Sequence, residues 1–197
     1  MRSARTLRSD RHRRHRRRHR PLLHLAEALE SRRLLSASLS GGVLTVTTGA
    51  AADLINLSIA SNNYSVTING GAAQTIAVAS VDSIVVNCND GADGVFLGSV
   101  VDPVQINGGN GIDVVEVGWG DNQMNGITAS VTFDGGADDD RVDLWDTGTT
   151  NRTFNIAGNT VTRSGWAGQL SYQSCVTLQI TAAPRTIRST CSSSPPG

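Results

Sequence analysis

A fourteen-residue internal repeat constrains the fold of this chain more than any other feature of its sequence. Counted from position 0, each copy has apolar residues at positions 0, 2, 11 and 13 and aspartate at position 9. The four copies read LTVTTGAAADLINL (44–57), IVVNCNDGADGVFL (84–97), VQINGGNGIDVVEV (104–117) and VTFDGGADDDRVDL (131–144). Apolar residues two apart face one side of a strand, and the Gly, Asn and Asp residues between them favour tight turns. Each copy is therefore predicted to form a strand, a turn and a second strand.

The spacing of the copies indicates how they are arranged. They start at residues 44, 84, 104 and 131, which gives steps of 40, 20 and 27 residues. No single copy can bury its own apolar face, so neighbouring copies must stack. Steps of 20 and 27 residues suit one coil each and do not fit a strict nine-residue β-roll. The sequence predicts an all-β domain that is a short, irregular, right-handed parallel β-helix or solenoid, and a β-sandwich of hairpins is the alternative.

Two segments outside the four copies also have strand patterns. The runs YSVTI and QTIAV flank Asn69-Gly70-Gly71, which predicts a β-hairpin over residues 63–79 within the 40-residue step. A further, weaker coil is expected over residues 151–181. Residues 178–183 resemble the start of another copy, with Leu178 and Ile180 at positions 0 and 2.

Charge and composition divide the chain into three parts. Residues 1–35 contain 12 of the 17 arginines and three acids, whereas residues 36–183 contain 14 acids and three arginines. We place an Arg-rich leader at residues 1–40, a Gly/Asp-rich β-repeat domain at residues 41–183 and an irregular tail at residues 184–197. The tail has no acid and no alternation, and a frameshifted or truncated reading of the gene is a hypothesis that sequencing around codon 184 tests.

The leader is expected to be a disordered arm over residues 1–20, since its like charges repel and it has little apolar surface to bury. A short amphipathic helix is predicted over residues 22–34. Nucleic-acid binding is not expected, because no aromatic residues are interleaved with the arginines. No stretch approaches the roughly 20 apolar residues of a membrane span, so none is predicted.

The end of the leader carries a specific motif. Residues 29–37 read LESRRLLSA, which resembles the LEPR-XLL motif near the N-terminus of many planctomycete surface and exported proteins. Ser31 stands where the motif has proline. The resemblance implies an extracellular or cell-surface location, and it suggests cell-envelope or extracellular-matrix components as partners.

The third copy of the repeat carries a second resemblance. Residues 108–116 read GGNGIDVVE, which fits the nonapeptide G-G-x-G-x-D-x-U-x and is similar to RTX (hemolysin-type) calcium-binding repeats. In such repeats calcium ions lie between successive turns. The resemblance implies Ca²⁺ as the ligand, and the candidate residues in the full and degenerate copies are Gly108, Gly109, Gly111, Asp113, Asp93, Asp140, Asp138 and Asp90.

The residue types of the repeat domain agree with a hard cation. Residues 36–183 contain no histidine and no lysine, which leaves carboxylate and carbonyl oxygens as ligands. If the coils stack in register, the position-9 aspartates form a column along one edge, and a cation would offset their repulsion. The alternative is that Asp and Asn only cap the turns through backbone hydrogen bonds.

The predicted function is a non-enzymatic structural or adhesive module of an exported or cell-surface protein, with calcium-stabilised turns. Catalysis is not expected, because the acids concentrate in turns and no histidine or lysine is available as a base. The alternative is a metal-free β-solenoid scaffold that binds a protein or a glycan. Trp119, Trp145 and Trp166 are either carbohydrate-stacking platforms or covers for the edges of the core.

The chain has three cysteines, Cys88, Cys175 and Cys191, with no C-x-x-C motif. A zinc or redox site is therefore not indicated. Buried single thiols are expected, with a bond between Cys88 and Cys175 as the alternative.

Overall fold

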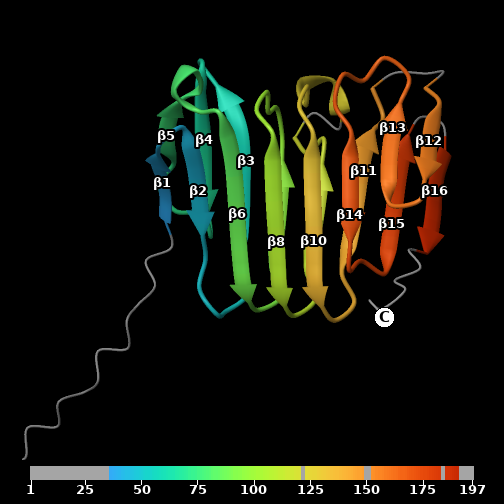
Figure 1. The fold of residues 1–197 in the computed structure, drawn as a ribbon, viewed down its shortest axis with the longest axis horizontal. Helices are drawn as coiled ribbons and strands as arrows, with labels where there is room; N and C mark the ends of the chain where they lie inside the picture. The colour runs from blue at the N-terminus through green and yellow to red at the C-terminus, as the bar shows by residue number, and fades with distance from the viewer. Residues whose placement is uncertain (1–35, 121–122, 149–151, 183–184, 191–197) are drawn as a thin grey trace, which may run out of the picture. The chain divides into compact units, whose positions relative to one another are not determined.

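The computed structural model of the chain is all-β and consists of two mixed eight-stranded sheets (Figure 1). It describes residues 36–120, 123–148, 152–182 and 185–190. Sheet A contains, in spatial order, β1 (Ser36–Ser40), β2 (Val43–Thr47), β6 (Ser83–Asp90), β8 (Val104–Asn110), β10 (Val131–Ala137), β14 (Leu170–Gln173), β13 (Thr160–Arg163) and β12 (Phe154–Ala157). Sheet B contains β16 (Arg185–Thr190), β15 (Thr177–Ala182), β11 (Arg141–Asp146), β9 (Val114–Val117), β7 (Gly94–Leu97), β3 (Leu54–Ala60), β4 (Asn63–Ile68) and β5 (Gln74–Ala77). The predicted helix over residues 22–34 lies outside the described residues.

The four copies of the repeat pair with one another in register. Their first strands are β2, β6, β8 and β10, which lie side by side and parallel in sheet A. Their second strands are β3, β7, β9 and β11, which lie parallel in sheet B. Position 0 of each copy faces position 0 of the next, as in the pairing of Ile84 with Val104 and of Val104 with Val131. The predicted in-register stacking of the copies is confirmed.

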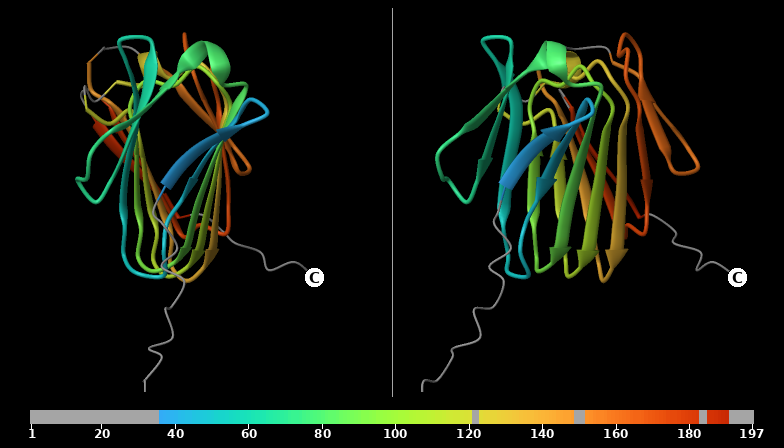
Figure 2. Two further views of the ribbon diagram at one scale, coloured as in Figure 1. Left: turned by 90° about the vertical axis from the view of Figure 1, so that its left-hand side faces the viewer. Right: turned by 60° about the vertical axis from the view of Figure 1, so that its left-hand side comes forward.

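The core lies between the two sheets, which face each other as two layers (Figure 2). Period-two alternation along each strand directs positions 0, 2, 11 and 13 inward. All sixteen of these side chains are buried, from Leu44 and Val46 in the first copy to Val142 and Leu144 in the fourth. At the edge of the core opposite the turns, Val100 and Ile127 form a parallel bridge, and both are fully buried beside Met124 of the short 3-10 turn η2 (Met124–Gly126). A second 3-10 turn, η1, spans Val78–Ser80.

The predicted hairpin over residues 63–79 is confirmed as β4 and β5, which pair antiparallel from Asn63–Ala77 to Val66–Gln74. Asn69 and Gly70 have φ angles of 53° and 67° at the turn. Only residues that tolerate the left-handed region fit these positions, and Asn-Gly does so at little cost. The hairpin extends sheet B beyond β3, so the 40-residue step does not contain an additional coil.

The fifth coil differs from its sequence-based prediction. β14 pairs in parallel with β10, and β15 pairs in parallel with β11. Leu178 aligns with Val142 and Ile180 aligns with Leu144, so these residues occupy positions 11 and 13 rather than 0 and 2. The prediction that residues 178–183 begin a new copy was therefore wrong. The turn between β14 and β15 is shorter than in the other copies, so the second strand follows the first more closely in the sequence. For this reason the repeat spacing did not predict the register of β15.

The β-region also extends past both predicted boundaries. β1 lies within the predicted leader and pairs antiparallel with β2 over five residue pairs, so sheet A begins at Ser36. β16 lies within the predicted irregular tail and pairs antiparallel with β15 over six residue pairs. Edge strands need few inward-facing apolar residues, which is why composition alone did not identify them.

Candidate functional site

The position-9 aspartates form a buried column along the turns. Asp53, Asp93, Asp113 and Asp140 have exposed fractions between 0% and 4%. Position 9 continues the alternation of positions 11 and 13, so its side chain points into the core rather than to solvent. Carboxylates are rarely this buried without a partner, so each one requires a physical explanation.

Hydrogen bonds join these aspartates into a ladder that runs across the coils. The amide nitrogen of Asp53 donates to Oδ1 of Asp93 at 2.6 Å, and the amide nitrogen of Asp93 donates to Oδ1 of Asp113 at 2.8 Å. The amide nitrogen of Asp113 donates to Oδ1 of Asp140 at 2.8 Å. Each carboxylate therefore binds the backbone of the preceding coil, and we call this arrangement the aspartate ladder. The predicted column of Asp93, Asp113 and Asp140 is confirmed.

The two ends of the aspartate ladder are closed differently. At the first coil, Asp53 accepts hydrogen bonds from Asn69 Nδ2 at 2.6 Å and from the Gly49 amide at 3.1 Å. The fifth coil has no aspartate at the equivalent place. There the Val176 amide donates to the carbonyl oxygen of Asp140 at 2.9 Å, and the buried Cys175 lies nearby.

The second carboxylate oxygen of three ladder residues has no hydrogen-bond donor. Oδ2 of Asp93, Asp113 and Asp140 is buried and unpartnered. The pKa of each of these carboxyls is raised to about 6, mainly by burial and also by neighbouring carboxylates, against the lowering effect of the backbone hydrogen bond. Near neutral pH these oxygens therefore either hold a proton part of the time or need a cation.

Glycines allow the coils to approach the aspartate ladder closely. A Cβ on Gly108 would clash with Asp113 Oδ2 and with the carbonyl oxygen of Gly135 on the next coil. A Cβ on Gly135 would clash with Asp140 Oδ2 and with the carbonyl oxygen of Ser174. At both places, an unpartnered carboxylate oxygen and a carbonyl oxygen from the turn of the next coil lie close to the Cα of a glycine.

The other two predicted glycines serve the turn itself. Gly109 and Gly111 have φ angles of 112° and 116°, in a region that side chains rarely adopt. A Cβ at either position would also clash with a carbonyl oxygen of the preceding turn, that of Asn89 or of Gly91. These two glycines are therefore required for turn geometry, whether or not a metal binds.

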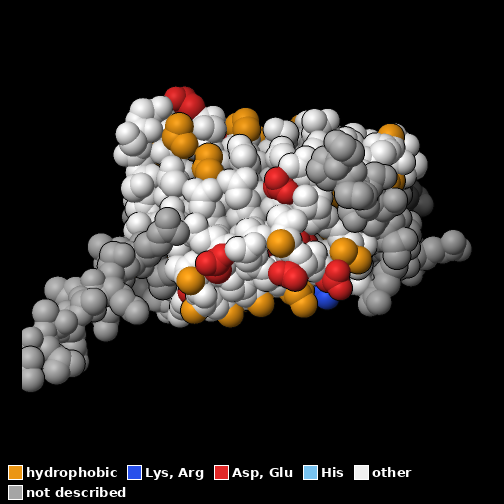
Figure 3. Space-filling view, turned by 60° about the horizontal axis from the view of Figure 1, so that its bottom comes forward, with side chains coloured by type: hydrophobic (Ala, Val, Ile, Leu, Met, Phe, Trp, Pro, Cys, Tyr) orange, Lys and Arg blue, Asp and Glu red, His pale blue; other side chains and the backbone are white. Residues whose placement is uncertain are grey.

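The remaining predicted ligands, Asp90 and Asp138, lie on the outside of the turns. Both side chains are exposed. Asn110 Nδ2 donates to Asp90 Oδ1 at 2.7 Å, and the Gly111 amide donates to Asp138 Oδ2 at 3.0 Å. Figure 3 shows acidic side chains among hydrophobic ones on the surface viewed toward this edge. The predicted ligands thus divide into an inner row that faces the core and an outer row that links adjacent turns at the surface.

The oxygen atoms at two positions along the inner row, those of Asp113 and Asp140, are of the kinds that calcium binds. Calcium binds carboxylate and backbone carbonyl oxygens, usually six to eight of them. Asp113 with the Gly135 carbonyl, and Asp140 with the Ser174 carbonyl, present both kinds of oxygen from consecutive turns. At the level of Asp93 the residue in place of the glycine is Cys88, whose sulfur is a poor calcium ligand. Across the described ranges no group of three or more His, Cys, Asp or Glu side chains is placed to hold a metal, so carbonyl oxygens or water would complete each site.

Cys88 and Cys175 are buried single thiols outside any disulfide, as the sequence predicted for both, and Cys191 lies outside the described residues. Burial raises the pKa of the Cys88 thiol far above its usual value, and the nearby Asp93 carboxylate adds to this effect. The thiol is therefore protonated and unreactive at neutral pH.

Sequence reasoning missed two features that the structure brings together. The first is a buried ion pair in which Arg163 Nη1 lies 2.6 Å from Asp146 Oδ1, with Asn125 Oδ1 accepting from Arg163 Nη2 at 2.9 Å. The second is a groove on the outer face of sheet B, where Phe96 and Trp119 pack with ring centroids 5.5 Å apart. An aromatic residue at the outward position 12 of the second copy was the available signal for the groove.

The three tryptophans do not form one platform. Trp119 is 41% exposed beside the groove, whereas Trp166 packs against the core and donates from Nε1 to the Ile127 carbonyl oxygen. Trp145 is half-buried on β11. Trp166 thus covers the edge of the core, and only Trp119 presents an exposed ring on the outer surface.

Comparison of the chain with protein-family models, with curated proteins and with solved structures finds no match. Within the described part of the chain, no helix has the length and apolar character needed to cross a membrane.

Proposed function

We propose that this chain is a non-enzymatic structural or adhesive module of an exported or cell-surface protein, built as a short right-handed parallel β-solenoid. Five parallel strands in the middle of each sheet support a solenoid over a sandwich, because sandwiches are built mainly from antiparallel strands. Arg-rich residues at the start of the chain and the LESRRLLSA motif support export.

The observation that carries a structural role is the aspartate ladder. One carboxylate oxygen of each aspartate, Asp93, Asp113 and Asp140, accepts a hydrogen bond from a backbone amide of the preceding coil. This bond leaves the three residues poorly suited to act on a substrate. Their side chains are also buried, with exposed fractions of at most 2%. Their position explains why each copy of the repeat keeps an aspartate at position 9.

We also propose that calcium stabilises the turns at Asp113 and Asp140. The unpartnered Oδ2 atoms and the turn carbonyls of Gly135 and Ser174 would hold the ion, together with water or further carbonyls. The ion would neutralise carboxylates that otherwise favour the protonated form, and it would hold adjacent turns together. The outer acids Asp90 and Asp138 would then contribute mainly through their own hydrogen bonds.

Thermal melting of the purified full chain tests the calcium proposal. At pH 7.5 we expect millimolar CaCl2 to raise Tm relative to EGTA, because calcium binds only the folded turns. Magnesium serves as the control, since it rarely forms sites from protein carbonyls alone. The variants Asp113→Asn and Asp140→Asn are expected to reduce the calcium-dependent shift, whereas the matched Asp82→Asn, at an exposed turn, is expected to keep it. An unchanged Tm in calcium would contradict the proposal.

A metal-free scaffold is the second candidate, and one observation favours it. The aspartate ladder already satisfies the buried amides of Asp53, Asp93 and Asp113 without a metal. In that case Asp113→Asn is expected to leave stability at pH 7.5 equal or higher, because the amide keeps the acceptor oxygen and removes a buried charge. The same melting series therefore separates the two candidates.

A further inference from the structure

A groove of about 360 Å³ lies on the outer face of sheet B, and its lining reaches the turn at Ala92 and Asp93. Four neighbouring strands contribute to its lining: β3 with Leu54, β7 with Gly94 and Phe96, β9 with Val114 and Glu116, and β11 with Arg141. These residues occupy positions 10 and 12 of the repeat, which point outward. The volume falls within the range of about 300–1,000 Å³ that is usual for small-ligand sites.

In the groove, β7 has glycine at position 10, and this glycine is buried. The corresponding residues on the strands beside it are Leu54 and Val114. A Cβ on Gly94 would lie 2.8 Å from Leu54 Cδ2 and 3.2 Å from Phe96 Cε2. The Leu54 and Phe96 side chains therefore cover Gly94 and form the surface of the groove at this place.

The walls of the groove are apolar and partly aromatic. Leu54 is 51% exposed and Ile112, at the turn, is 55% exposed. The Phe96 ring lines the groove, and the exposed Trp119 ring packs against it at an interplanar angle of 50°. Exposed apolar surface of this kind is costly in water and commonly marks a binding site.

Polar groups lie at one end of the groove. Glu116 of β9 and Asp143 of β11 are cross-strand neighbours, and Arg141 Nη2 lies 2.9 Å from Asp143 Oδ2. The Arg141 side chain remains 44% exposed while the ion pair holds it in place. The groove thus has a guanidinium donor and a carboxylate acceptor next to aromatic surface.

We infer that this groove binds a neutral saccharide chain, with a sugar ring against Phe96 and Val114, and with hydroxyl groups bonded to Glu116 and Arg141. Sugar rings have an apolar C–H face, which suits an aromatic ring, and hydroxyls, which both donate and accept. The two carboxylates against one guanidinium disfavour an anionic ligand. The inference deepens the glycan-binding alternative given above and does not depend on calcium.

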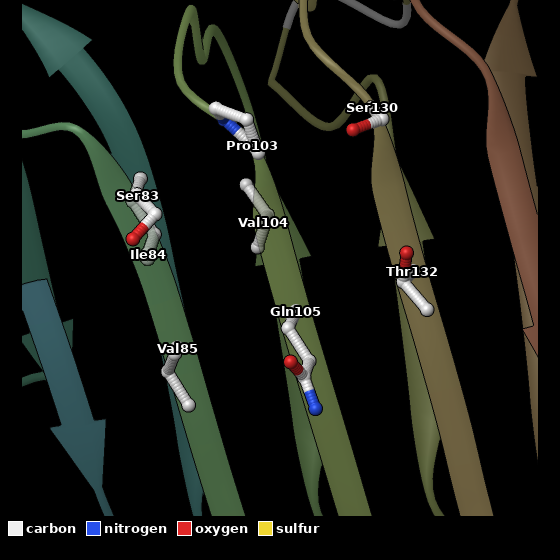
Figure 4. Close-up of a pocket in the computed structure, with 8 residues that line it drawn as sticks. All are labelled: Ser83, Ile84, Val85, Pro103, Val104, Gln105, Ser130 and Thr132. Carbon is white, nitrogen blue, oxygen red and sulfur yellow. The ribbon is translucent and has the colours of Figure 1, made fainter. Parts of the chain in front are cut away.

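The scale of the groove argues against a protein partner. A stable protein–protein interface buries about 800 Å² on each side, far more than a single groove of this size offers. A second hollow, of about 230 Å³, lies on the outer face of sheet A between β6, β8 and β10 (Figure 4). Ser83, Gln105, Ser130 and Thr132 line it, with no charged or aromatic side chain, so it provides a matched negative control.

Titration of the full chain with soluble oligosaccharides tests the inference. The probes are cellohexaose, xylohexaose, mannohexaose and chitohexaose at millimolar concentration, with tryptophan fluorescence reporting on Trp119 and amide NMR locating the shifts. We expect at least one probe to bind, with NMR shifts at Gly94, Phe96 and Glu116, and with equal affinity in calcium and in EGTA. Phe96→Ala and Glu116→Gln are each expected to weaken binding at least tenfold, whereas Gln105→Ala is expected to leave it unchanged.

Two results would overturn the inference. One is the absence of binding by all four saccharides to a chain whose melting curve shows that it is folded. The other is binding that Phe96→Ala and Glu116→Gln leave unaffected. Because the conservative Glu116→Gln keeps the shape of the side chain, a folding defect in Phe96→Ala does not prevent a decision. A failed calcium shift with intact saccharide binding would reject the calcium proposal alone.

Discussion

The backbone amide of Asp93 donates a hydrogen bond of 2.8 Å to the carboxylate of Asp113, twenty residues further along the chain. The same relationship joins Asp53 to Asp93 and Asp113 to Asp140. A side chain thus provides the contact between coils at a turn, where the regular backbone ladder of the sheets is interrupted. The consequences for stability can be measured separately for each coil.

Removing one member of the aspartate ladder is expected to destabilise the fold. Asp113→Ala leaves the buried Asp93 amide without an acceptor, and an unsatisfied buried donor costs about 1–3 kcal/mol. Asp113→Asn keeps an acceptor oxygen and removes a buried charge, so at pH 7.5 it should not show this loss. Urea denaturation in EGTA measures both variants, with Asp82→Ala as the exposed control. Equal stability of Asp113→Ala and the wild type would show that the ladder bond contributes nothing.

The stability of the metal-free protein should decrease as pH rises through the acid range, whereas the stability of a protein held by ion pairs increases there. The pKa of Asp93, Asp113 and Asp140 rises to about 6 in the folded state, above the roughly 4 expected for the unfolded chain. Between these values the folded state binds more protons, so stability falls as pH increases from about 4 to about 6 and is level above about 7. Two pKa units correspond to about 3 kcal/mol for one carboxyl. Denaturation in EGTA across this range measures the slope.

A triple variant provides the control for that slope. Asp93→Asn, Asp113→Asn and Asp140→Asn together remove the three titrating groups while keeping the shape of the turns. We expect a flatter pH profile in the triple variant. A wild-type stability that rises between pH 4 and pH 6 would contradict the assignment of raised pKa values to the ladder.

Gly108 is expected to tolerate no side chain. In Gly108→Ala the new Cβ meets Asp113 Oδ2 and the backbone carbonyl of Gly135, neither of which can move freely. We expect a loss of about 1–3 kcal/mol, typical of overpacking. Gly94→Ala is the matched control, because its Cβ would meet only the ends of the Leu54 and Phe96 side chains. Chemical denaturation should therefore show a larger loss in the free energy of unfolding for Gly108→Ala than for Gly94→Ala. Equal losses in the two variants would refute the close approach at Gly108.

The buried ion pair between Arg163 and Asp146 should be sensitive to removal of one partner. Arg163→Met leaves the Asp146 carboxylate buried without compensation, which typically costs about 3–5 kcal/mol. Adding Asp146→Leu should restore part of that loss, because no buried charge then remains. Arg152→Met, at a less buried position, is the control and should change stability little. A double variant as unstable as Arg163→Met alone would contradict this reading.

The sequence predicted the repeating part of the fold well, for a physical reason. Apolar residues at positions 0, 2, 11 and 13 can be buried only if adjacent copies stack in one register, and the paired strands have that register. The hairpin at Asn69-Gly70 was predictable because few residues accept its backbone angles. The edge strands β1 and β16 were not predictable, since an edge strand is held mainly by backbone hydrogen bonds to one neighbour and needs little apolar pattern.

The candidate site was predicted in part. The spacing placed Asp93, Asp113 and Asp140 in one column, as found, but it could not separate them from Asp90 and Asp138. That separation depends on which way each side chain points within a tight turn, and Asp138 has a φ of 79° that no alternation rule describes. The groove on sheet B was also missed, because it is formed by Leu54, Phe96, Glu116 and Arg141 from four copies whose outward positions share no pattern.

Carbon-13 NMR titration of the aspartate carboxyl groups tests the aspartate ladder most directly. In EGTA, the carboxyls of Asp93, Asp113 and Asp140 are predicted to titrate near pH 6, well above the roughly 4 of an unperturbed aspartate. With calcium, the Asp113 and Asp140 carboxyls should titrate at a lower pH, because the ion favours the charged form. Titration of all three carboxyls near pH 4 in EGTA, together with no change in calcium, would contradict both the buried ladder and its role in holding the metal.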